Sequence, residues 1–354
     1  MRRYNILFLT FFLSSLSIIV GINFSIDPAG LFRNSGSEAE MAKLLLNSNY
    51  LSVAGNYDER QFKKYCVLYE PTDRPITLIT GSSRSMQISG DNLGSSVLNL
   101  SVSGASIEDH LALGVLGLRH LKVNRIVVGL DPWVFNVASG QNRWESINLE
   151  FEAAILMLHL SAGTNNHQKS YQSSKFTQLL NWSYTESSIN TLLSGNTSRY
   201  KASDSGTPES GFLKIRRDGS LIYTSDRESL STNAVGKEAA DAAVYSLGNF
   251  SFSKPALALL DSFVGLMQKT TKVDIFLPPY HPIAFEKMNM LHPELKIVEA
   301  EIRRFAESKA IKVWGSYDPT RSNCSSNDFY DEMHPKDSCI RKIFVPSHFD
   351  RGSL

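Results

Sequence analysis

Apolar and polar positions alternate along the chain in a way that predicts a parallel sheet covered by helices. Short apolar runs predict strands at 76–80, 97–100, 125–130, 273–277 and 311–314. Between these runs, apolar residues at helical spacing predict helices from 106 onward, over 255–269 and over 295–308. The run at 125–130 is apolar on both faces, as in a strand buried within a parallel sheet. We therefore expect an α/β fold with a doubly wound sheet of five parallel strands.

This alternation is interrupted between about 135 and 253, after the third predicted strand. A helix is expected over 149–160, and the stretch 162–206 is rich in Ser, Asn, Thr and Gln. Residues 212–223 have the pattern of a hairpin that turns at Asp218-Gly219. Insertions of this length inside an α/β domain are usually functional, so we expect a lid or a substrate surface. The domain that carries the insertion is expected to cover 74–354.

The first 26 residues are predicted to anchor the chain in a membrane. Arg2 and Arg3 precede an uncharged run, 4–26, which is close to the roughly 20 residues that cross a bilayer. The arginines favour a cytoplasmic N-terminus, which makes the rest of the chain extracytoplasmic or periplasmic. The alternative is a signal peptide cleaved near Ser15-Leu16-Ser17. Residues 27–73 are expected to form a stalk and a helix near 38–46 that packs onto the domain.

Composition and charge narrow the classes of function. Hydrophobic residues make up 42% of the chain and aromatic residues 10%, which is ordinary for a folded protein and excludes wholesale disorder. Lys and Arg number 36 against 35 Asp and Glu, which gives a net charge of +1. Because no basic block is present, nucleic acid is not an expected partner.

Two polar clusters at the ends of predicted strands suggest nucleophilic catalysis. Ser83 follows the first strand in Gly81-Ser-Ser-Arg84, where backbone N–H groups and a helix dipole favour an attacking oxygen and a later oxyanion. Asp331-Glu-Met-His334 follows the last strand. An Asp three residues before a His reaches the imidazole Nδ1 and leaves Nε2 facing a nucleophile. Each motif alone is common in ordinary turns and surface loops, so the prediction depends on their combination.

Taken together, these motifs resemble the SGNH/GDSL hydrolase superfamily. Gly81-Ser82-Ser83 is similar to its first block, although Ser82 stands where the family more often has Asp. Gly104 lies where the second block supplies a backbone N–H to the oxyanion hole, and Asp331 and His334 match the last block. The resemblance implies a flavodoxin-like SGNH fold over roughly 74–345, apart from the insertion, with Ser83, His334 and Asp331 as the catalytic residues. The anchor, G-S-S-R and D-x-x-H-P resemble most the cell-envelope branch, which includes proteins that work beside membrane-bound O-acyltransferases.

One block departs from the family. Its third motif, G-x-N, corresponds here to Gly129-Leu130-Asp131. An asparagine side chain donates a hydrogen bond to the oxyanion, whereas an ionised aspartate repels it. Either Asp131 has another role, such as pairing with Arg84, or the oxyanion hole relies on backbone N–H groups near Ser83 and on Gly104.

Further residues are expected to line the substrate site. Tyr280 and His281 follow the fourth strand in Pro278-Pro-Tyr-His-Pro, where the alternative role of the prolines is only to shape a turn. Arg84 is expected either to hold an anionic or sugar-linked group or to form a salt bridge. Trp133 has two readings, stacking on a sugar ring and buried packing.

The three cysteines leave three alternatives open. Cys324 and Cys339 flank the D-x-x-H motif, and a disulfide between them fits an oxidising compartment. Three unpaired thiols, including Cys66, are the second alternative. The third is a zinc site that combines Cys324 and Cys339 with His334, which lacks the usual C-x-x-C pair.

The expected function is a serine-dependent esterase or O-acyltransferase, with acetyl as the expected acyl group. Its substrate is expected to be an acylated carbohydrate of the cell envelope or an exported polysaccharide, and a membrane-bound O-acyltransferase is the implied partner. The reaction needs no metal or other cofactor. Two rivals remain: a non-catalytic carbohydrate-binding or assembly protein with the same fold, and a metal-dependent hydrolase built on Asp331, His334 and the cysteines.

Overall fold

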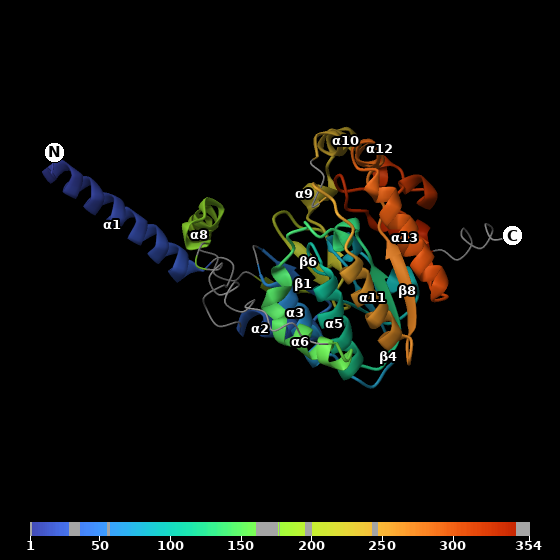
Figure 1. Ribbon diagram of the computed structural model, residues 1–354. Helices are drawn as coiled ribbons and strands as arrows, with labels where there is room; N and C mark the ends of the chain where they lie inside the picture. Colours follow the sequence, from blue (N-terminus) through green and yellow to red (C-terminus); the bar gives the residue numbers. More distant parts are fainter. Residues whose placement is uncertain are drawn as a thin grey trace.

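A five-stranded parallel sheet forms the centre of the molecule (Figure 1). The computed structural model describes residues 2–27, 36–54, 57–160, 176, 178–194, 200–242 and 247–344. The strands of this sheet are β2 (Ile76–Thr80), β3 (Val97–Asn99), β4 (Val123–Gly129), β8 (Lys272–Leu277) and β9 (Lys312–Gly315). Their order is β3-β2-β4-β8-β9, and all neighbouring pairs are parallel. The five predicted strands are therefore confirmed, and the strand order fits a flavodoxin-like fold in general.

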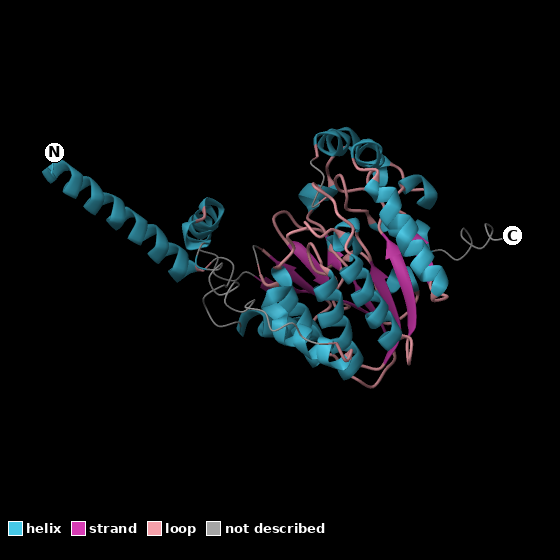
Figure 2. Ribbon diagram, in the orientation of Figure 1, coloured by secondary structure: helices cyan, strands magenta, loops and turns pink. Residues whose placement is uncertain are grey.

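Helices cover both faces of this sheet (Figure 2). One face packs against α5 (Ile107–His120), α11 (Lys254–Met267) and α13 (Glu294–Ser308), which are the three predicted helices. The other face packs against α4 (Gly90–Leu93) and α14 (Asp337–Phe344).

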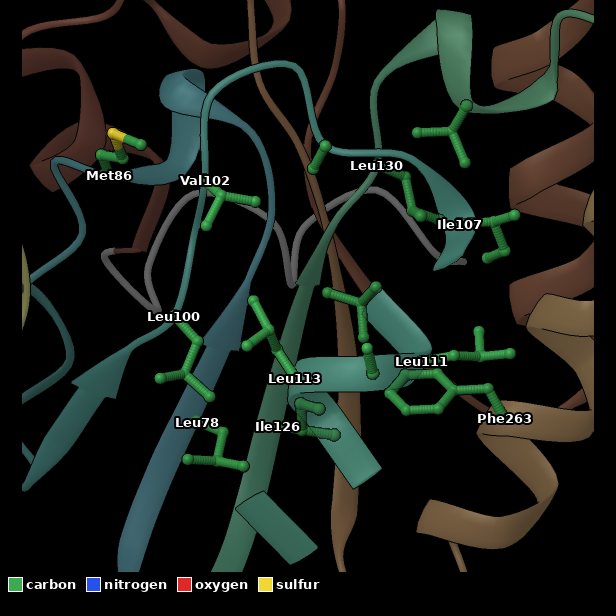
Figure 3. Packing of buried hydrophobic residues seen from close by; sticks show 14 of the residues in the cluster. Leu78, Met86, Leu100, Val102, Ile107, Leu111, Leu113, Ile126, Leu130 and Phe263 are labelled. Carbon is green, nitrogen blue, oxygen red and sulfur yellow. The ribbon is translucent and has the colours of Figure 1, made fainter. Parts of the chain in front are cut away.

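Alternate residues of each central strand enter the two hydrophobic cores. In β2, Leu78 belongs to the core beneath α5 and α11, whereas its neighbour Ile79 belongs to the core beneath α14. Figure 3 shows the larger core, where Ile126 of β4 and Leu111 of α5 pack near Phe263 of α11. Burial on both faces explains why these strands read as continuous apolar runs.

The helix α5 begins as its sequence predicts. The side chain of Asp109 accepts a hydrogen bond from the N–H of Ser106, the N-cap residue, at 2.9 Å. The Ser106 side chain in turn accepts from the backbone N–H of Asp109, which completes a capping box. This box fixes the start of α5 directly after the loop that contains Gly104.

A second, antiparallel sheet joins two parts of the chain that the sequence predicted separately. Its order is β5-β1-β6-β7, with β1 (Tyr50–Val53), β5 (Tyr200–Ser203), β6 (Leu213–Arg216) and β7 (Leu221–Ile222). The hairpin of β6 and β7 is present as predicted, and Gly219 in its turn has a φ of +79°. However, β1 precedes the central domain and pairs with both β5 and β6. The segment 27–73 thus contributes the strand β1 to a sheet that the insertion completes, in addition to the expected helix near 38–46, which is α2.

Most of the remaining helices lie around these two sheets, whereas α8 (Trp182–Ser194) lies beside α1 (Arg2–Ile26). Before the central sheet, α2 (Gly36–Leu46) packs against α3 (Glu59–Tyr69). The insertion contains α6 (Asn148–Met157), α8, α9 (Ser225–Glu228) and α10 (Thr232–Asp241), and α12 (Pro282–Leu291) follows β8. The helix predicted at 149–160 is confirmed as α6, whereas much of the polar stretch 162–206 lies outside the described residues.

The N-terminal helix α1 (Arg2–Ile26) points away from the body of the molecule (Figure 1). Its segment Leu7–Ile26 has a mean hydropathy of 2.1, and only 6% of it is buried. Such a helix is long and apolar enough to be a membrane anchor, and a signal sequence has the same properties.

Candidate active site

Ser83 lies immediately beyond the carboxyl end of β2, in the first turn of a short 3₁₀ helix at Ser83–Ser85. The hydroxyl of Ser82 caps this turn by accepting a hydrogen bond from the N–H of Arg84 at 3.1 Å. The turn fits closely against the strands because Gly81 lacks a side chain, since a Cβ there would lie 2.4 Å from Ser85 Oγ. A Cβ on Gly129 of β4 would also collide with this oxygen. The two glycines therefore let the turn that presents Ser83 sit on the ends of β2 and β4.

His334 and Asp331 lie in a tight loop before α14. The N–H groups of Met333 and His334 donate to Asp331 Oδ1 at 3.0 and 2.9 Å. The N–H of Tyr330 donates to the carbonyl oxygen of His334 at 2.9 Å and closes the loop. Hydrogen bonds from His334 and from these backbone groups lower the pKa of Asp331 to about 2, against the opposing effect of burial. The carboxylate is therefore ionised at neutral pH and acts only as an acceptor.

Ser83, His334 and Asp331 form a connected chain of hydrogen bonds. Nδ1 of His334 lies 2.8 Å from both carboxylate oxygens of Asp331, and Nε2 lies 2.8 Å from Ser83 Oγ. Because an ionised carboxylate accepts a hydrogen bond, Nδ1 carries the imidazole proton and Nε2 is free to accept the proton of Ser83. The His334 side chain keeps 18% of its surface exposed, so the chain of groups is open to solvent at this end.

Arg84 connects the serine turn to two other strand ends and to the loop of His334. Its Nε donates to the carbonyl oxygen of Met333 at 3.0 Å, and its Nη1 donates to Asp131 Oδ1 at 2.7 Å. Its Nη2 donates to the carbonyl oxygen of Pro278 at 2.5 Å. The guanidinium also lies 3.6 Å from the centre of the Tyr280 ring. Arg84 thus links the turn of Ser83 directly to the loop of His334.

The side chains of Arg84 and Asp131 are buried beneath Ser83 and the loop of His334. They are 0% and 1% exposed, and all three guanidinium nitrogens of Arg84 have partners. Burial raises the pKa of Asp131 despite the opposing charge of Arg84. The expectation that these two side chains line the substrate site is therefore corrected, because both are buried. The predicted pairing of Asp131 with Arg84 is confirmed.

Tyr280 and His281 are also buried, at 1% and 0% exposure. The N–H of His281 donates to the carbonyl oxygen of Glu332 at 3.0 Å, so His281 supports the loop of His334. Its Nδ1 accepts a hydrogen bond from the N–H of Ile283 at 3.2 Å, and burial lowers its pKa. The expectation that these two side chains contact substrate is corrected here, because both are buried, Tyr280 against Arg84 and His281 against the loop of His334. Trp133 is 1% exposed and follows its packing alternative.

Gly104 lies in the loop after β3, with a φ of +56° that favours glycine. The preceding residue, Ser103, is held from α3. Its N–H and hydroxyl donate to the carboxylate of Glu59 at 2.5 and 2.9 Å, and its carbonyl accepts from Arg60 at 3.2 Å. Among the residues that the structure describes, none accepts a hydrogen bond from the N–H of Ser83 or of Gly104. Both N–H groups therefore lack a protein acceptor within the described part of the chain.

Sequence reasoning missed two groups of residues at this site. One is Tyr223, directly after β7. The centre of its ring lies 5.8 Å from that of His334 and 4.3 Å from that of Tyr330, on which it stacks. Glu59 and Arg60, at the start of α3, are the other group. For Tyr223 the sequence offered only an aromatic residue at the end of the predicted hairpin. For Glu59 and Arg60 it offered only Asp58, a possible N-cap, which in the structure accepts a hydrogen bond from the N–H of Arg60 at 3.0 Å.

The structure joins Cys324 and Cys339 in a disulfide that encloses the loop of His334. Cys66 remains a buried thiol, and burial raises its pKa to about 12. The first of the three alternatives for the cysteines is therefore the one observed. Because both sulfurs are in the disulfide, they do not serve as zinc ligands here, and the described residues contain no cluster of three or more His, Cys, Asp or Glu suited to a metal.

Comparison with known proteins leaves the site to be interpreted from its own geometry. No family model matches the chain, and no curated protein matches it at a significant level.

Proposed function

We propose that the chain is a serine-dependent esterase or O-acyltransferase of the SGNH type, attached to a membrane by α1, with its catalytic domain outside the cytoplasm. The observation that carries the proposal is the hydrogen-bonded order Ser83, His334, Asp331, with 2.8 Å between Ser83 Oγ and Nε2 and 2.8 Å between Nδ1 and the carboxylate. This is the geometry that activates a serine hydroxyl.

In the first half-reaction, Ser83 Oγ attacks the carbonyl carbon of an ester while its proton passes to His334 Nε2. The electron pair of the C=O bond moves to the oxygen, and the tetrahedral oxyanion forms. The collapse of this intermediate breaks the bond to the leaving alkoxide, which takes the proton from Nε2. The acyl group is then bound to Ser83.

In the second half-reaction, His334 removes a proton from water or from a carbohydrate hydroxyl, and that oxygen attacks the carbonyl carbon of the acyl-serine. The second tetrahedral intermediate then collapses, the bond between the acyl carbon and Ser83 Oγ breaks, and Oγ takes the proton back from His334 Nε2. Water gives hydrolysis, and the carbohydrate gives transfer of the acyl group. Both outcomes use the same three side chains. The partly exposed ring of Tyr223 beside His334 offers an apolar face to a sugar ring, which favours a carbohydrate over a small free ester.

The oxyanion requires donors that do not come from Asp131, because Arg84 engages that carboxylate below the site. We assign this role to the N–H groups of Ser83 and Gly104. Backbone donors that are fixed before the reaction lower the barrier without reorganising. The departure from the G-x-N pattern is then a structural substitution, in which Asp131 balances the buried charge of Arg84.

A serine-reactive fluorophosphonate probe tests the proposal. The full chain in detergent is expected to be labelled, and Ser83→Ala is expected to remove the label. Ser308→Ala is the matched control, because that exposed hydroxyl donates to the carbonyl oxygen of Phe305 within α13, away from the site. If a correctly folded wild-type chain takes no label, the site is not a catalytic serine, and a carbohydrate-binding or assembly protein becomes the better account.

A further inference from the structure

Helix α8 in the insertion exposes several large apolar side chains. Trp182 is 77% exposed and Leu193 is 80% exposed, and Ile189 and Leu192 are 42% and 54% exposed. In contrast, Thr185 and Ser188 of the same helix are buried, at 8% and 0%. Among the side chains of α8 that the structure describes, Thr185 and Ser188 thus face the protein and the large apolar residues face outward, which is the reverse of a helix on the surface of a water-soluble domain.

The exposed residues form one stripe along the helix. Trp182, Ile189 and Leu193 are separated by seven and four positions, which places them on the same side of an α-helix. Leu192 lies at the edge of this stripe. One acidic residue, Glu186, also lies on this side, and no Lys or Arg occurs between Trp182 and Ser194.

The end of α1 holds this helix through a polar side chain. Asn23 is 0% exposed, and its Nδ2 donates to the carbonyl oxygen of Leu179 and to Thr185 Oγ1, both at 2.8 Å. Asn23 lies within the apolar segment Leu7–Ile26, three residues before its end. At 1.5 Å per residue, the contact with α8 is about 4.5 Å inside the end of that segment. Figure 1 shows α8 beside this end of α1, to one side of the globular body.

We propose that α8 lies in the water–lipid interface of the bilayer that α1 spans, with the stripe of Trp182, Ile189 and Leu193 in contact with the acyl chains. This inference depends on α1 being a membrane span, as stated under the proposed function. A helix fixed at the level where a span leaves the hydrocarbon has its outward face in lipid or in the headgroup layer. Tryptophan is enriched at that depth, and a carboxylate such as Glu186 reaches the headgroups from it.

The hydrogen bonds of Asn23 support the same placement. An amide donor inside a membrane span is costly to leave unpaired, because hydrocarbon supplies no acceptor. The segment of η4 (Gln178–Leu180) and α8 provides two acceptors for Asn23 Nδ2, whereas Asn23 Oδ1 accepts no hydrogen bond within the described residues. The absence of Lys and Arg from α8 indicates that attachment is apolar rather than electrostatic, and so does not require anionic lipids.

This attachment gives the insertion a function beyond its contacts at the active site. One membrane span alone leaves a domain free to rotate about it. Two attached elements, α1 and α8, restrict this rotation and keep the active site at a defined orientation above the bilayer. The same insertion also supplies Tyr223 next to His334, so it connects the membrane surface to the site.

Trp182 allows a direct test, because the other three tryptophans, Trp133, Trp144 and Trp314, are 1%, 7% and 7% exposed. The full chain is reconstituted in phosphatidylcholine vesicles whose acyl chains carry bromine, which quenches tryptophan only on contact. The difference in emission between wild type and Trp182→Phe isolates the signal of Trp182. We expect most of this signal to be quenched when bromine lies near the ester carbonyls, and less when it lies at the chain ends.

The result that overturns the proposal is emission from Trp182 that brominated lipid leaves unchanged and that aqueous iodide quenches. Leu193→Glu, in the same stripe, is expected to shift Trp182 toward iodide quenching, and Glu186→Gln is the matched control that keeps or deepens the lipid contact. Flotation of the vesicles and N-terminal sequencing report separately whether α1 is retained as an anchor. Fluorophosphonate labelling reports separately whether the site is catalytic, so the three failures are distinguishable.

Discussion

Arg84 connects the two segments that carry the candidate catalytic residues. It follows Ser83 in the chain and donates to the carbonyl of Met333, between Asp331 and His334. Its charge is buried, so it requires a buried counter-charge, which Asp131 provides. The Gly-Ser-Ser-Arg and Gly-Leu-Asp motifs are therefore linked: the arginine after the serine explains the aspartate at the position where asparagine was expected.

Asp131→Asn tests this explanation at the residue scale. If Asp131 were an impaired oxyanion group, an asparagine would raise kcat. We expect the opposite, because the substitution leaves the buried guanidinium without its counter-charge, at a cost of about 3–5 kcal/mol of unfolding free energy. Urea unfolding and ester turnover measured on the same preparation decide between the two. A stable variant with increased kcat would contradict the role given to Asp131.

The acidity of Asp331 predicts how stability depends on pH. Its pKa in the folded chain is about 2, below the ordinary value of 3.8. Because the pKa is lower in the folded state, ionised Asp331 stabilises the folded chain. This contribution to the unfolding free energy is complete above about pH 4 and is lost as the pH falls toward 2. A shift of this size corresponds to about 2 kcal/mol. We expect wild type to lose this much more unfolding free energy than Asp331→Asn between pH 5 and pH 2. Parallel losses in the two proteins would show that Asp331 is not stabilised in the folded state.

At the scale of elements, helix α3 positions the loop that contains Gly104. Glu59 binds the N–H and hydroxyl of Ser103, and Arg60 binds the carbonyl of Ser103 and the carboxylate of Asp109. These contacts fix the loop between β3 and α5 from both sides of its backbone. A helix that precedes the central sheet in sequence is thus part of the support of the active site.

Glu59 is a positioning residue, and its removal is expected to affect catalysis rather than binding. Glu59→Ala frees the loop of Ser103 and Gly104, and we expect kcat to fall about 10- to 100-fold with KM little changed. Glu59→Gln keeps one acceptor and is expected to restore part of kcat. Glu70→Gln, at the other end of α3, is the control, since Glu70 pairs with Arg217 at 2.8 Å away from this loop. Equal effects of Glu59→Ala and Glu70→Gln on kcat would reduce α3 to a purely structural role.

At the scale of the whole molecule, the sequence predicted what depends on local patterns. The five strands of the central sheet, α5 with its capping box, α11, α13 and the β6–β7 hairpin each have a signal within one continuous segment. The second sheet was missed because β1 has four residues and pairs with β5 and β6, about 150 residues later in the chain. Short strands paired across that separation leave no periodic pattern of their own.

The site shows the same division between local and long-range information. Ser83, Asp331 and His334 were predicted because a strand end and an i, i+3 spacing identify them, and the structure brings them together. The prediction that Tyr280 and His281 contact substrate was wrong, because both side chains are buried. Their burial depends on Arg84 and on the loop of His334, which are distant in sequence. The contribution of Tyr223 depends on the packing of the second sheet against the first, which no local motif encodes.

Hydrolysis of p-nitrophenyl acetate by the full chain in detergent tests the central claim most directly. The comparison is between wild type, Ser83→Ala, His334→Ala and the control Ser308→Ala, each at matched folding. We predict measurable turnover by wild type and Ser308→Ala, and a fall of at least about 1000-fold in kcat for each of the other two variants. Wild-type turnover that survives Ser83→Ala would contradict the account, because the ester would then be cleaved without the serine that the site presents to His334.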